Sequence, residues 1–377
     1  MSRTKPLLIV HVIHHLVIGG MENGVVNLIN RMPKDRFRHA VVCIEDYSDF
    51  RDRIEDTSVE VHAMHRSKIG AWRLRWRLWR IFRQLRPDIV HTRGLSGLDA
   101  LLAARLAGAK TVHSEHGYDV DNLSGQASKP ALLRRLHAPL VQRFVSVSRD
   151  LERTMSERWG APRRLIRQIY NGVDVGRFRP AEAGAHRLLP AELQAADPFV
   201  IGTVGRLQQV KDQATLLRAF ASVLERWPEW RGRLRLALVG DGPMRESLHR
   251  LADELGIEGQ TWFAGARNDI ADLLRGFDVF VLPSLNEGIS NTLLEAMASG
   301  VPVLASAVGG NVELLDPGVV GEGFAAGDDR ALAAMIENYV SDANRCLQHG
   351  AAARRRAVEH FSLQAMVAGY ADVYQGL

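Results

Sequence analysis

Short apolar runs alternate with longer amphipathic stretches along most of this chain. A short apolar run bounded by polar or turn residues is typical of a buried strand, whereas apolar residues spaced three and four apart are typical of a helix that packs by one face. Strands that alternate with helices form a parallel, doubly wound sheet, because each parallel connection needs a crossover helix. We therefore expect an α/β protein.

Two such alternating series are predicted, one in each half of the chain. The first has strands at Leu7–Val12, His39–Ile44, Val59–Ala63, Ile89–His91, Lys110–Ser114, Phe144–Val147 and Ile166–Tyr170, with helices that include Asn23–Arg31, Arg73–Gln84 and Leu98–Ala107. The second has strands at Phe199–Val204, Arg235–Val239, Thr261–Ala264, Val279–Leu282 and Val301–Ala305. The stretch between the two series is rich in Ala and Pro and lacks strand signals, which indicates a connection between two domains. The length of 377 residues also favours two domains over one.

Composition narrows the class of protein. The hydrophobic content of 46% and the charged content of 24% are typical of a soluble globular protein. Cys43 and Cys346 are far apart and match no metal-binding spacing, so we expect a reduced, cytoplasmic setting. No apolar run reaches the roughly 18 residues of a membrane span. The apolar stretch from Leu7 to Ile18 is interrupted by three histidines, which indicates a buried first strand rather than a signal peptide.

Charge is distributed unevenly between the two halves. Residues 1–180 contain 31 Lys and Arg against 18 Asp and Glu, whereas residues 181–377 contain 17 against 25. A basic first half and an acidic second half predict different partners for the two domains.

Two carboxylates eight positions apart are the most informative feature for function. Glu287 precedes the predicted start of a helix near Ser290, and Glu295 lies about two turns inside that helix. A helix N-terminus offers free backbone N–H groups that suit a phosphate. The two carboxylates could then bind two hydroxyl-bearing parts of one phosphorylated ligand, as a nucleotide-sugar site requires.

Two cations follow the first predicted strand of the second half. Gly205-Arg206-Leu207 comes directly after that strand, and Lys211 opens the next helix. Ligands of α/β proteins bind at the carboxyl ends of the strands, so Arg206 and Lys211 are candidates to neutralise a diphosphate. Taken alone, the pair could equally form surface salt bridges.

Three further loops follow predicted strands. Gly240 lies in a Gly-Asp-Gly-Pro turn. Its lack of a side chain would allow a ligand to approach the backbone closely, although the segment could equally be an ordinary strand-to-helix turn. Gly19-Gly20 would allow a tight turn into a helix, although it is not the dinucleotide pattern. His113, Glu115 and His116 lie at the end of another strand, where an isolated histidine is more often structural than catalytic.

Together these motifs resemble the retaining glycosyltransferases of family 4. The segment from Glu287 to Glu295 resembles their E-x7-E signature, and V-G-R-L-x(3)-K-D resembles their donor-phosphate motif. The resemblance implies the GT-B fold, in which two Rossmann-like doubly wound parallel-sheet domains face a cleft. It implies an acceptor-binding domain at 1–180, a linker at 181–198, a donor-binding domain at 199–360 and a C-terminal helix at 361–377 that crosses back to the first domain.

The same resemblance implies a role for each motif. Arg206, Lys211, Glu287 and His116 would be catalytic, with Glu287 on the sugar hydroxyls and Glu295 on the ribose. Other contacts to the donor would come from the glycine loops and the start of the helix: Gly19, Gly20, Gly205, Gly240, Gly288, Ile289, Ser290, Asn291 and Thr292. We expect no metal and no cofactor, because Arg206 and Lys211 would take the place of a metal and the chain has no D-x-D trio in a suitable loop. Within the family, the chain resembles bacterial transferases of exopolysaccharide assembly.

Three functions remain open at this point. The first is transfer of a sugar from a nucleotide sugar to a glycan or lipid-linked acceptor. The second is a nucleotide-sugar epimerase or phosphorylase of the same fold, and the third is a noncatalytic scaffold that binds nucleotide sugars. Neither the donor sugar, its base nor the acceptor can be read from the residues, since these pockets follow no local code.

A basic, tryptophan-rich helix is predicted at residues 73–84 and its flanks. Its aliphatic stripe, Leu74, Leu78, Ile81 and Leu85, should pack on the sheet. Trp72, Trp76 and Trp79 would then face outward among arginines, which suits an anionic membrane surface, although these tryptophans could instead pack on a neighbouring element. We expect a peripheral position on the inner face of the plasma membrane and no nucleic acid partner, because no nucleic-acid motif is present.

Overall fold

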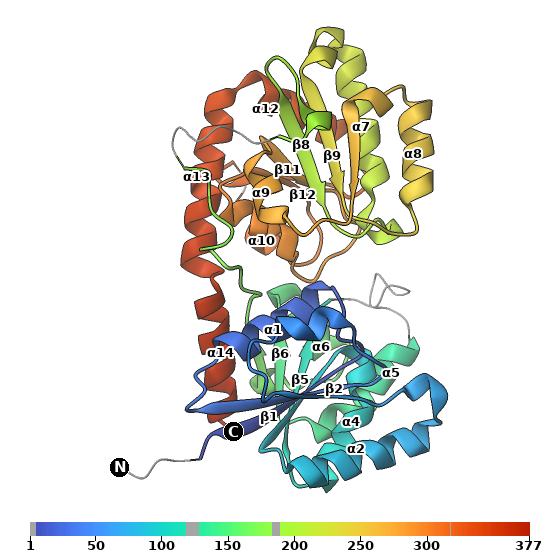
Figure 1. Cartoon of the computed structure of the whole chain (residues 1–377), viewed down its shortest axis with the longest axis vertical. Coiled ribbons are helices and arrows are strands. Elements are labelled where there is room, and N and C mark those ends of the chain that lie inside the picture. Colours follow the sequence, from blue (N-terminus) through green and yellow to red (C-terminus); the bar gives the residue numbers. More distant parts are fainter. Residues whose placement is uncertain (1–4, 118–127, 183–188, 317) are drawn as a thin grey trace. The chain divides into compact units, whose positions relative to one another are not determined.

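The computed structural model describes residues 5–117, 128–182, 189–316 and 318–377. Contacts divide the chain into two compact units (Figure 1): unit 1 comprises Met1–Gly172 and Leu363–Leu377, and unit 2 comprises Val173–Ser362. The chain therefore changes unit between Gly172 and Val173 and again between Ser362 and Leu363. The stretch 181–198, which the sequence suggests as a connection, lies within unit 2, where Leu193 is fully buried.

Unit 1 contains a seven-stranded, fully parallel sheet with the strand order β3-β2-β1-β4-β5-β6-β7. The order runs outward in both directions from the central pair β1 and β4, as in doubly wound folds. Its strands are β1 (Leu7–Ile13), β2 (Phe37–Cys43), β3 (Glu60–Ala63), β4 (Ile89–Arg93), β5 (Lys110–Glu115), β6 (Arg143–Ser146) and β7 (Ile166–Gln168).

Helices cover both faces of this sheet. One face packs against α1 and α14, which bury Leu28 and Tyr374 among strand residues such as Ile9. The opposite face packs against α2 and α4, which bury Leu74 and Ala103. The helices of unit 1 are α1 (Gly20–Arg31), α2 (Ala71–Leu85), α3 (Gly94–Gly97), α4 (Asp99–Leu106), α5 (Ser128–His137), α6 (Arg149–Glu157) and α14 (Leu363–Gln375).

Unit 2 repeats the architecture with a six-stranded parallel sheet of order β10-β9-β8-β11-β12-β13. Its strands are β8 (Phe199–Val204), β9 (Leu234–Val239), β10 (Thr261–Gly265), β11 (Val279–Leu282), β12 (Val303–Ser306) and β13 (Gly321–Phe324). Its helices are α7 (Gln213–Arg226), α8 (Arg245–Glu254), α9 (Ile270–Arg275), α10 (Asn291–Ala298), α11 (Asn311–Leu314), α12 (Asp329–Ser341) and α13 (Ala343–His360).

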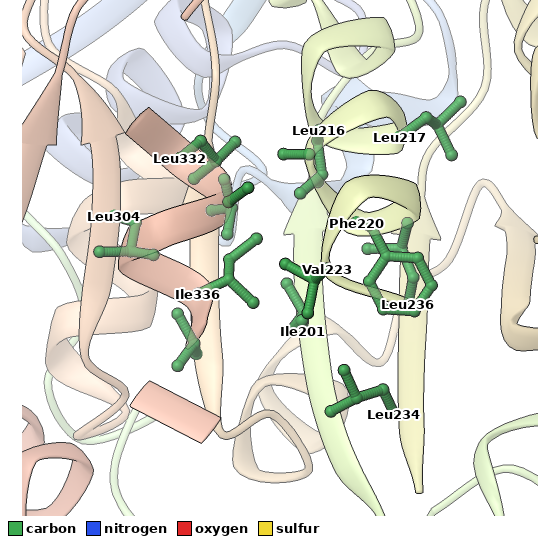
Figure 2. Close-up of a cluster of buried hydrophobic side chains, with 14 of the residues drawn as sticks. Ile201, Leu216, Leu217, Phe220, Val223, Leu234, Leu236, Leu304, Leu332 and Ile336 are labelled. Atoms are coloured by element: carbon green, nitrogen blue, oxygen red, sulfur yellow. The ribbon is translucent and has the colours of Figure 1, made fainter. Parts of the chain in front are cut away.

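The core of unit 2 forms where α7 and α12 pack on the sheet (Figure 2). Leu216, Phe220 and Val223 of α7 are spaced three and four apart and meet the β8 residue Ile201. Ile336 of α12 joins the same cluster, and all of these side chains are almost completely buried. Burial of a large aliphatic or aromatic side chain typically contributes about 1.5–3 kcal/mol, so this cluster anchors the helices that flank the central strands.

The GT-B fold class predicted from the sequence is confirmed, with two doubly wound parallel sheets. Strand β13 was not predicted, because its sequence Gly-Glu-Gly-Phe has neither an apolar run nor alternation. The close packing of the sheet explains this composition. A Cβ atom at Gly321 would lie 1.9 Å from the carbonyl oxygen of Val303, so only glycine fits beside β12.

Candidate functional site

Whereas Gly19 and Gly20 belong to unit 1, the predicted donor-binding residues of the second half of the chain lie near the centre of the unit 2 sheet. Strands β8 and β11 are neighbours there, and the strand order reverses direction between them. The loops that leave their carboxyl ends separate at such a point, which makes it the usual ligand site of doubly wound sheets. The loop after β8 contains Arg206 and Lys211, and the loop after β11 contains Glu287.

Lys211 and Glu287 form an ion pair across these two loops. Lys211 Nζ lies 2.5 Å from Glu287 Oε1, and Ser284 Oγ donates to the same oxygen at 2.7 Å. The carboxylate side chain is 10% exposed, so the pair is largely shielded from solvent. A backbone bond from Leu285 N to Val210 O, 2.8 Å long, holds the two loops together. Sequence reasoning missed Ser284, whose only signal was its position three residues before Glu287.

The loop of Glu287 and Gly288 packs directly on a pair of glycines that follow β12. A Cβ atom at Gly309 would lie 1.9 Å from Glu287 O, and one at Gly310 would lie 1.9 Å from Gly288 O. Gly309 also has φ +48°, which favours glycine. This close backbone contact holds the loop that contains Glu287 against the loop that follows β12.

A second glycine pair supports the loop after β8. A Cβ atom at Gly240 would lie 2.0 Å from Gly205 O, and one at Gly242 would lie 2.4 Å from Leu207 O. Leu207 N also donates to Asp241 O at 3.0 Å. The Gly-Asp-Gly turn therefore has a structural reason for its glycines, namely close contact with the loop that contains Arg206.

Arg206 and Lys211 differ in their surroundings. The Arg206 side chain is exposed, and its carbonyl oxygen accepts a bond from Gln213 Nε2 at 3.2 Å. Lys211 precedes Asp212, a non-glycine residue with φ +45° that caps the start of α7. Backbone strain of this kind is common at binding sites, where it helps to position a side chain.

The start of α10 forms as the sequence predicts. Ser290 is the N-cap, and its Oγ accepts a bond from Leu293 N at 3.3 Å and lies 3.2 Å from Thr292 Oγ1. Ile289 is buried against Gly310, while Asn291 begins the helix. Glu295 is half-buried one turn further along. Glu287 and Glu295 thus lie on either side of a helix N-terminus whose backbone N–H groups suit an anion.

Unit 1 has its own point of strand-order reversal, between β1 and β4. Gly19 is the N-cap of α1 with an extended backbone, and Gly20 begins the helix, so the predicted helix N-terminus is present. Asn23 N donates to Gly19 O at 2.9 Å in the first turn.

His116 follows β5 at the same edge of the unit 1 sheet. Its Nε2 atom is buried and has no hydrogen-bond partner within the described part of the chain. Burial, followed by the nearby charge of Arg93, lowers the pKa of His116 to about 3, so the imidazole is neutral at physiological pH. A neutral imidazole with a free ring nitrogen can exchange a hydrogen bond with a sugar hydroxyl.

His113 and Glu115 are engaged in a structural cluster. Glu115 Oε1 accepts bonds from Arg134 Nε at 2.6 Å and from His113 Nε2 at 3.2 Å. Burial opposes the charge of Glu115, but Arg134 and His113 hold its pKa at about 2. The guanidinium of Arg134 also lies over the Trp159 ring at 4.1 Å. His113 and Glu115 use their side-chain hydrogen bonds within this cluster, whereas the Nε2 atom of His116 has no partner among the described residues.

Sequence reasoning missed a buried histidine network on the other face of the sheet. Arg93 donates to His11 Nδ1 at 3.1 Å and to His91 Nδ1 at 3.3 Å. His11 Nε2 in turn lies 3.0 Å from His39 Nδ1, and His91 Nδ1 lies 2.6 Å from the Tyr374 hydroxyl of α14. Burial is the main cause that lowers the pKa of His11, His39 and His91. The one sequence signal was that His11 and His91 interrupt apolar strands, and the register pairs them side by side.

Within the residues that the structure describes, no group of three or more His, Cys, Asp or Glu side chains is arranged to hold a metal ion. None of the described helices is both long and apolar enough to cross a membrane.

Known proteins place the chain among glycosyltransferases. Residues 18–177 match the family described as Glycosyltransferase Family 4, and residues 187–356 match Glycosyl transferases group 1. The chain is 33% identical over 306 residues to the D-inositol 3-phosphate glycosyltransferase of Thermobispora bispora, which covers 77% of this chain and 70% of that protein. It is 31% identical over 316 residues to EpsD of Bacillus subtilis, covering 78% and 80%.

A third relative and a solved structure extend the comparison. The UDP-Gal:alpha-D-GlcNAc-diphosphoundecaprenol alpha-1,3-galactosyltransferase of Escherichia coli is 28% identical over 323 residues, covering 82% of each chain. The crystal structure of Anabaena Alr3699/HepE in complex with UDP and glucose has a TM-score of 0.84 at 20% identity and covers 98% of this chain and 100% of that one, which shows the same fold. The chain therefore belongs to glycosyltransferase family 4 and is a retaining enzyme that transfers a hexose from a nucleotide-sugar donor.

Proposed function

We propose that this enzyme transfers a hexose from a nucleotide sugar to a lipid-linked glycan in the assembly of an exopolysaccharide or another cell-surface polysaccharide. The observation that carries the proposal is the Lys211–Glu287 pair at the central strands of unit 2, next to the N-terminus of α10. Similarity to EpsD supports the exopolysaccharide assignment, and the name of the Escherichia coli relative supports a lipid-diphosphate acceptor.

In the proposed site, unit 2 binds the donor. Arg206 and Lys211 neutralise the diphosphate, with Gly205 and Gly240 allowing the backbone to approach the ligand. Glu287 accepts bonds from hydroxyls of the transferred sugar, and Glu295 accepts bonds from the ribose. The segment from Gly288 to Thr292 contributes backbone N–H groups at the start of α10.

Unit 1 contributes the remaining groups in this proposal. Gly19 and Gly20 bring the N-terminus of α1 to a donor phosphate, and His116 offers its free Nε2 to the transferred sugar. Residues 1–180 are proposed to hold the acceptor, residues 199–360 the donor, and 361–377 to join the C-terminus to the first domain. Helix α14, within that last range, packs on the unit 1 sheet through Met366 and Tyr370.

The proposed chemical step leaves the configuration of the sugar unchanged. The bond between the anomeric carbon and the donor phosphate breaks, and the acceptor oxygen bonds to that carbon on the same face. The acceptor proton passes to the departing phosphate oxygen, so the products are the nucleoside diphosphate and the glycosylated acceptor. Arg206 and Lys211 stabilise the charge that grows on the leaving phosphate, in the place that a metal ion takes in other transferases.

The setting follows from the acceptor. A lipid-linked glycan cannot leave the bilayer, so we place the enzyme at the cytoplasmic face of the plasma membrane, with the exposed tryptophans of α2 at an anionic membrane surface. The donor, in contrast, is a water-soluble nucleotide sugar.

A panel assay tests the proposed function. The protein is incubated with radiolabelled UDP- and GDP-sugars, with and without a bacterial lipid extract, and label is measured in the lipid fraction. We expect transfer only when the extract is present, and markedly slower transfer by a Glu287→Gln control. Conversion of the free donor to its epimer would favour an epimerase, and release of sugar phosphate would favour a phosphorylase. Donor binding without any turnover would favour a scaffold, and each of these three results would overturn the proposal.

A further inference from the structure

Three helices of unit 1 lie on the same face of its sheet. Helices α2 and α4 pack on Val10 and Val90. The register pairs Thr92 with His113 of β5, two positions before Glu115, so Glu115 points to that face as well. Arg134 of α5 bonds to Glu115, so α5 covers the sheet beside α4 (Figure 1). The outer sides of α2, α4 and α5, which we call the three-helix surface, therefore face one direction.

Apolar side chains on this surface point away from the sheet. On α5, Leu132 and Leu136 lie two positions from the buried Arg134, which is about 200° around the helix, and Leu136 is 64% exposed. On α4, Leu102 and Leu106 lie opposite the buried alanines, and Leu106 is 65% exposed. Exposed leucines at such positions have no role in the core.

Helix α2 contributes the largest apolar groups. Trp72 is 81% exposed and Trp76 is 53% exposed, while Leu74 and Leu78 of the same helix are completely buried. Arg75 bonds to Asp99 at the start of α4 at 3.0 Å, so the two helices are joined side by side. The tryptophans and the leucines of α4 thus form neighbouring parts of one surface.

This surface is predominantly basic. Helices α2, α4 and α5 contain nine Lys or Arg, of which Arg134 is buried against Glu115, and a single acid, Asp99. Asp99 is already paired with Arg66 and Arg75. The exposed cations include Arg80 and Arg83 beside the tryptophans and Arg135 beside the leucines. A surface that combines bulky apolar groups with unopposed cations is complementary to a bilayer with anionic headgroups.

We propose that the three-helix surface, and not α2 alone, docks on an anionic phospholipid bilayer. The inference rests on the proposed function for its purpose, which is to bring the enzyme to a lipid-linked acceptor. Its physical basis does not depend on the proposed function. The apolar groups of the three helices would enter the bilayer interface, and the surrounding cations would contact the lipid headgroups. Basic residues near such a surface are attracted to its anionic headgroups, and tryptophan is well suited to the headgroup region.

Sedimentation with vesicles tests the proposal on the full-length chain. Vesicles of phosphatidylcholine are compared with vesicles of phosphatidylcholine mixed with phosphatidylglycerol. We expect binding only to the anionic vesicles, and release as salt screens the attraction. Failure of the wild type to bind anionic vesicles at low salt would overturn the proposal, even if the protein were captured by another macromolecule.

Variants separate the parts of the surface. The triple variant W72A/W76A/W79A and the double variant L132S/L136S should each lower the partition coefficient, the first by about tenfold or more. If only the tryptophan variant weakens binding, α2 acts alone and the three-helix proposal is wrong. The matched control is W227A, which alters an exposed tryptophan of unit 2 and should bind like the wild type.

Two further measurements keep the outcomes distinct. All substituted side chains are exposed or half-exposed, and circular dichroism checks that each variant folds. Binding of the donor nucleotide, measured by calorimetry, should be equal in all variants. A variant that binds the donor but no longer binds vesicles is defective in this surface alone. A wild-type protein that binds no donor would count against the proposed function.

Discussion

Lys211 Nζ lies 2.5 Å from Glu287 Oε1, although the two residues are 76 positions apart in the chain. The proposed roles assign the cation to the donor diphosphate and the carboxylate to the sugar hydroxyls. Each group neutralises the other in this structure, so neither is left as an unpaired, partly buried charge. A bound donor would replace this single ion pair by several contacts, from its diphosphate to Lys211 and from its sugar hydroxyls to Glu287. Because the two side chains already lie together, the site is organised before the donor binds.

Removal of either cation should slow transfer strongly. We expect Lys211→Ala and Arg206→Ala each to reduce kcat by about 10²–10³, since loss of one donor to a developing anion typically has this effect. Turnover is measured with saturating donor, with Arg218→Ala, an exposed arginine of α7, as the control. Near-normal turnover in both site variants, with an intact fold, would exclude their role at the phosphates.

The two glutamates should differ in their kinetic effects. We expect Glu295→Gln to weaken donor binding with little change in kcat, because the ribose is remote from the reacting carbon and its contacts are uniform. Glu287→Gln should mainly lower kcat, because contacts to the transferred sugar can tighten in the transition state. Donor titration and turnover of both variants decide this, and the opposite pattern would mean that the two roles are exchanged.

A single methyl group at Gly309 should displace Glu287. A Cβ atom there would lie 1.9 Å from Glu287 O, so the loop must shift and donor affinity should fall at least about tenfold. Gly327→Ala is the matched control, because Gly327 also has a positive φ but open space around its Cβ position. Equal donor affinity in both variants, measured by calorimetry, would show that the position of this loop does not matter for binding.

Transfer should continue in EDTA. Arg206 and Lys211 are proposed to stabilise the leaving diphosphate without a metal ion. Initial rates are compared with and without EDTA, then after addition of Mg²⁺ or Mn²⁺. Complete loss of transfer in EDTA that either ion restores would contradict this expectation.

The buried histidines should make the protein less stable in mild acid. Burial lowers the pKa of His39 to about 4, and it also lowers the pKa of His11 and His91, whereas each would have a pKa near about 6.5 in the unfolded chain. Between these values the unfolded chain binds more protons, so the free energy of unfolding falls as pH falls from about 7 to about 5. Urea unfolding at several pH values measures the slope.

A variant identifies one of the groups responsible for that slope. His39→Asn keeps an acceptor for His11 Nε2 but removes the titrating ring, so the slope should decrease by about one proton. A wild-type stability that does not fall on acidification would contradict the neutral state of the network.

The sequence determined the fold class and the local form of the site. Alternation of apolar runs with amphipathic stretches predicted two parallel sheets because this periodicity is a local property of the chain. Ser290 predicted the start of α10 for a similar reason, since an N-cap acts on its own first turn. Leu74 and Leu78 predicted the buried side of α2, and the outward position of Trp72 and Trp76 followed from helical geometry.

The tertiary structure decided the contacts between distant segments. Only the pairing of β8 with β11 brings Lys211 to Glu287 and adds Ser284, and nothing local in either loop encodes that distance. Strand β13 was not predicted because Gly321 is required by close contact with the backbone of the neighbouring strand β12, and the strand itself has no apolar periodicity. In the same way, the pairing of β1 with β4 sets His11 beside His91, and the fold joins the outer sides of α2, α4 and α5 into one surface. Periodicity acts over a few residues, whereas these relationships arise from packing between residues far apart in the chain.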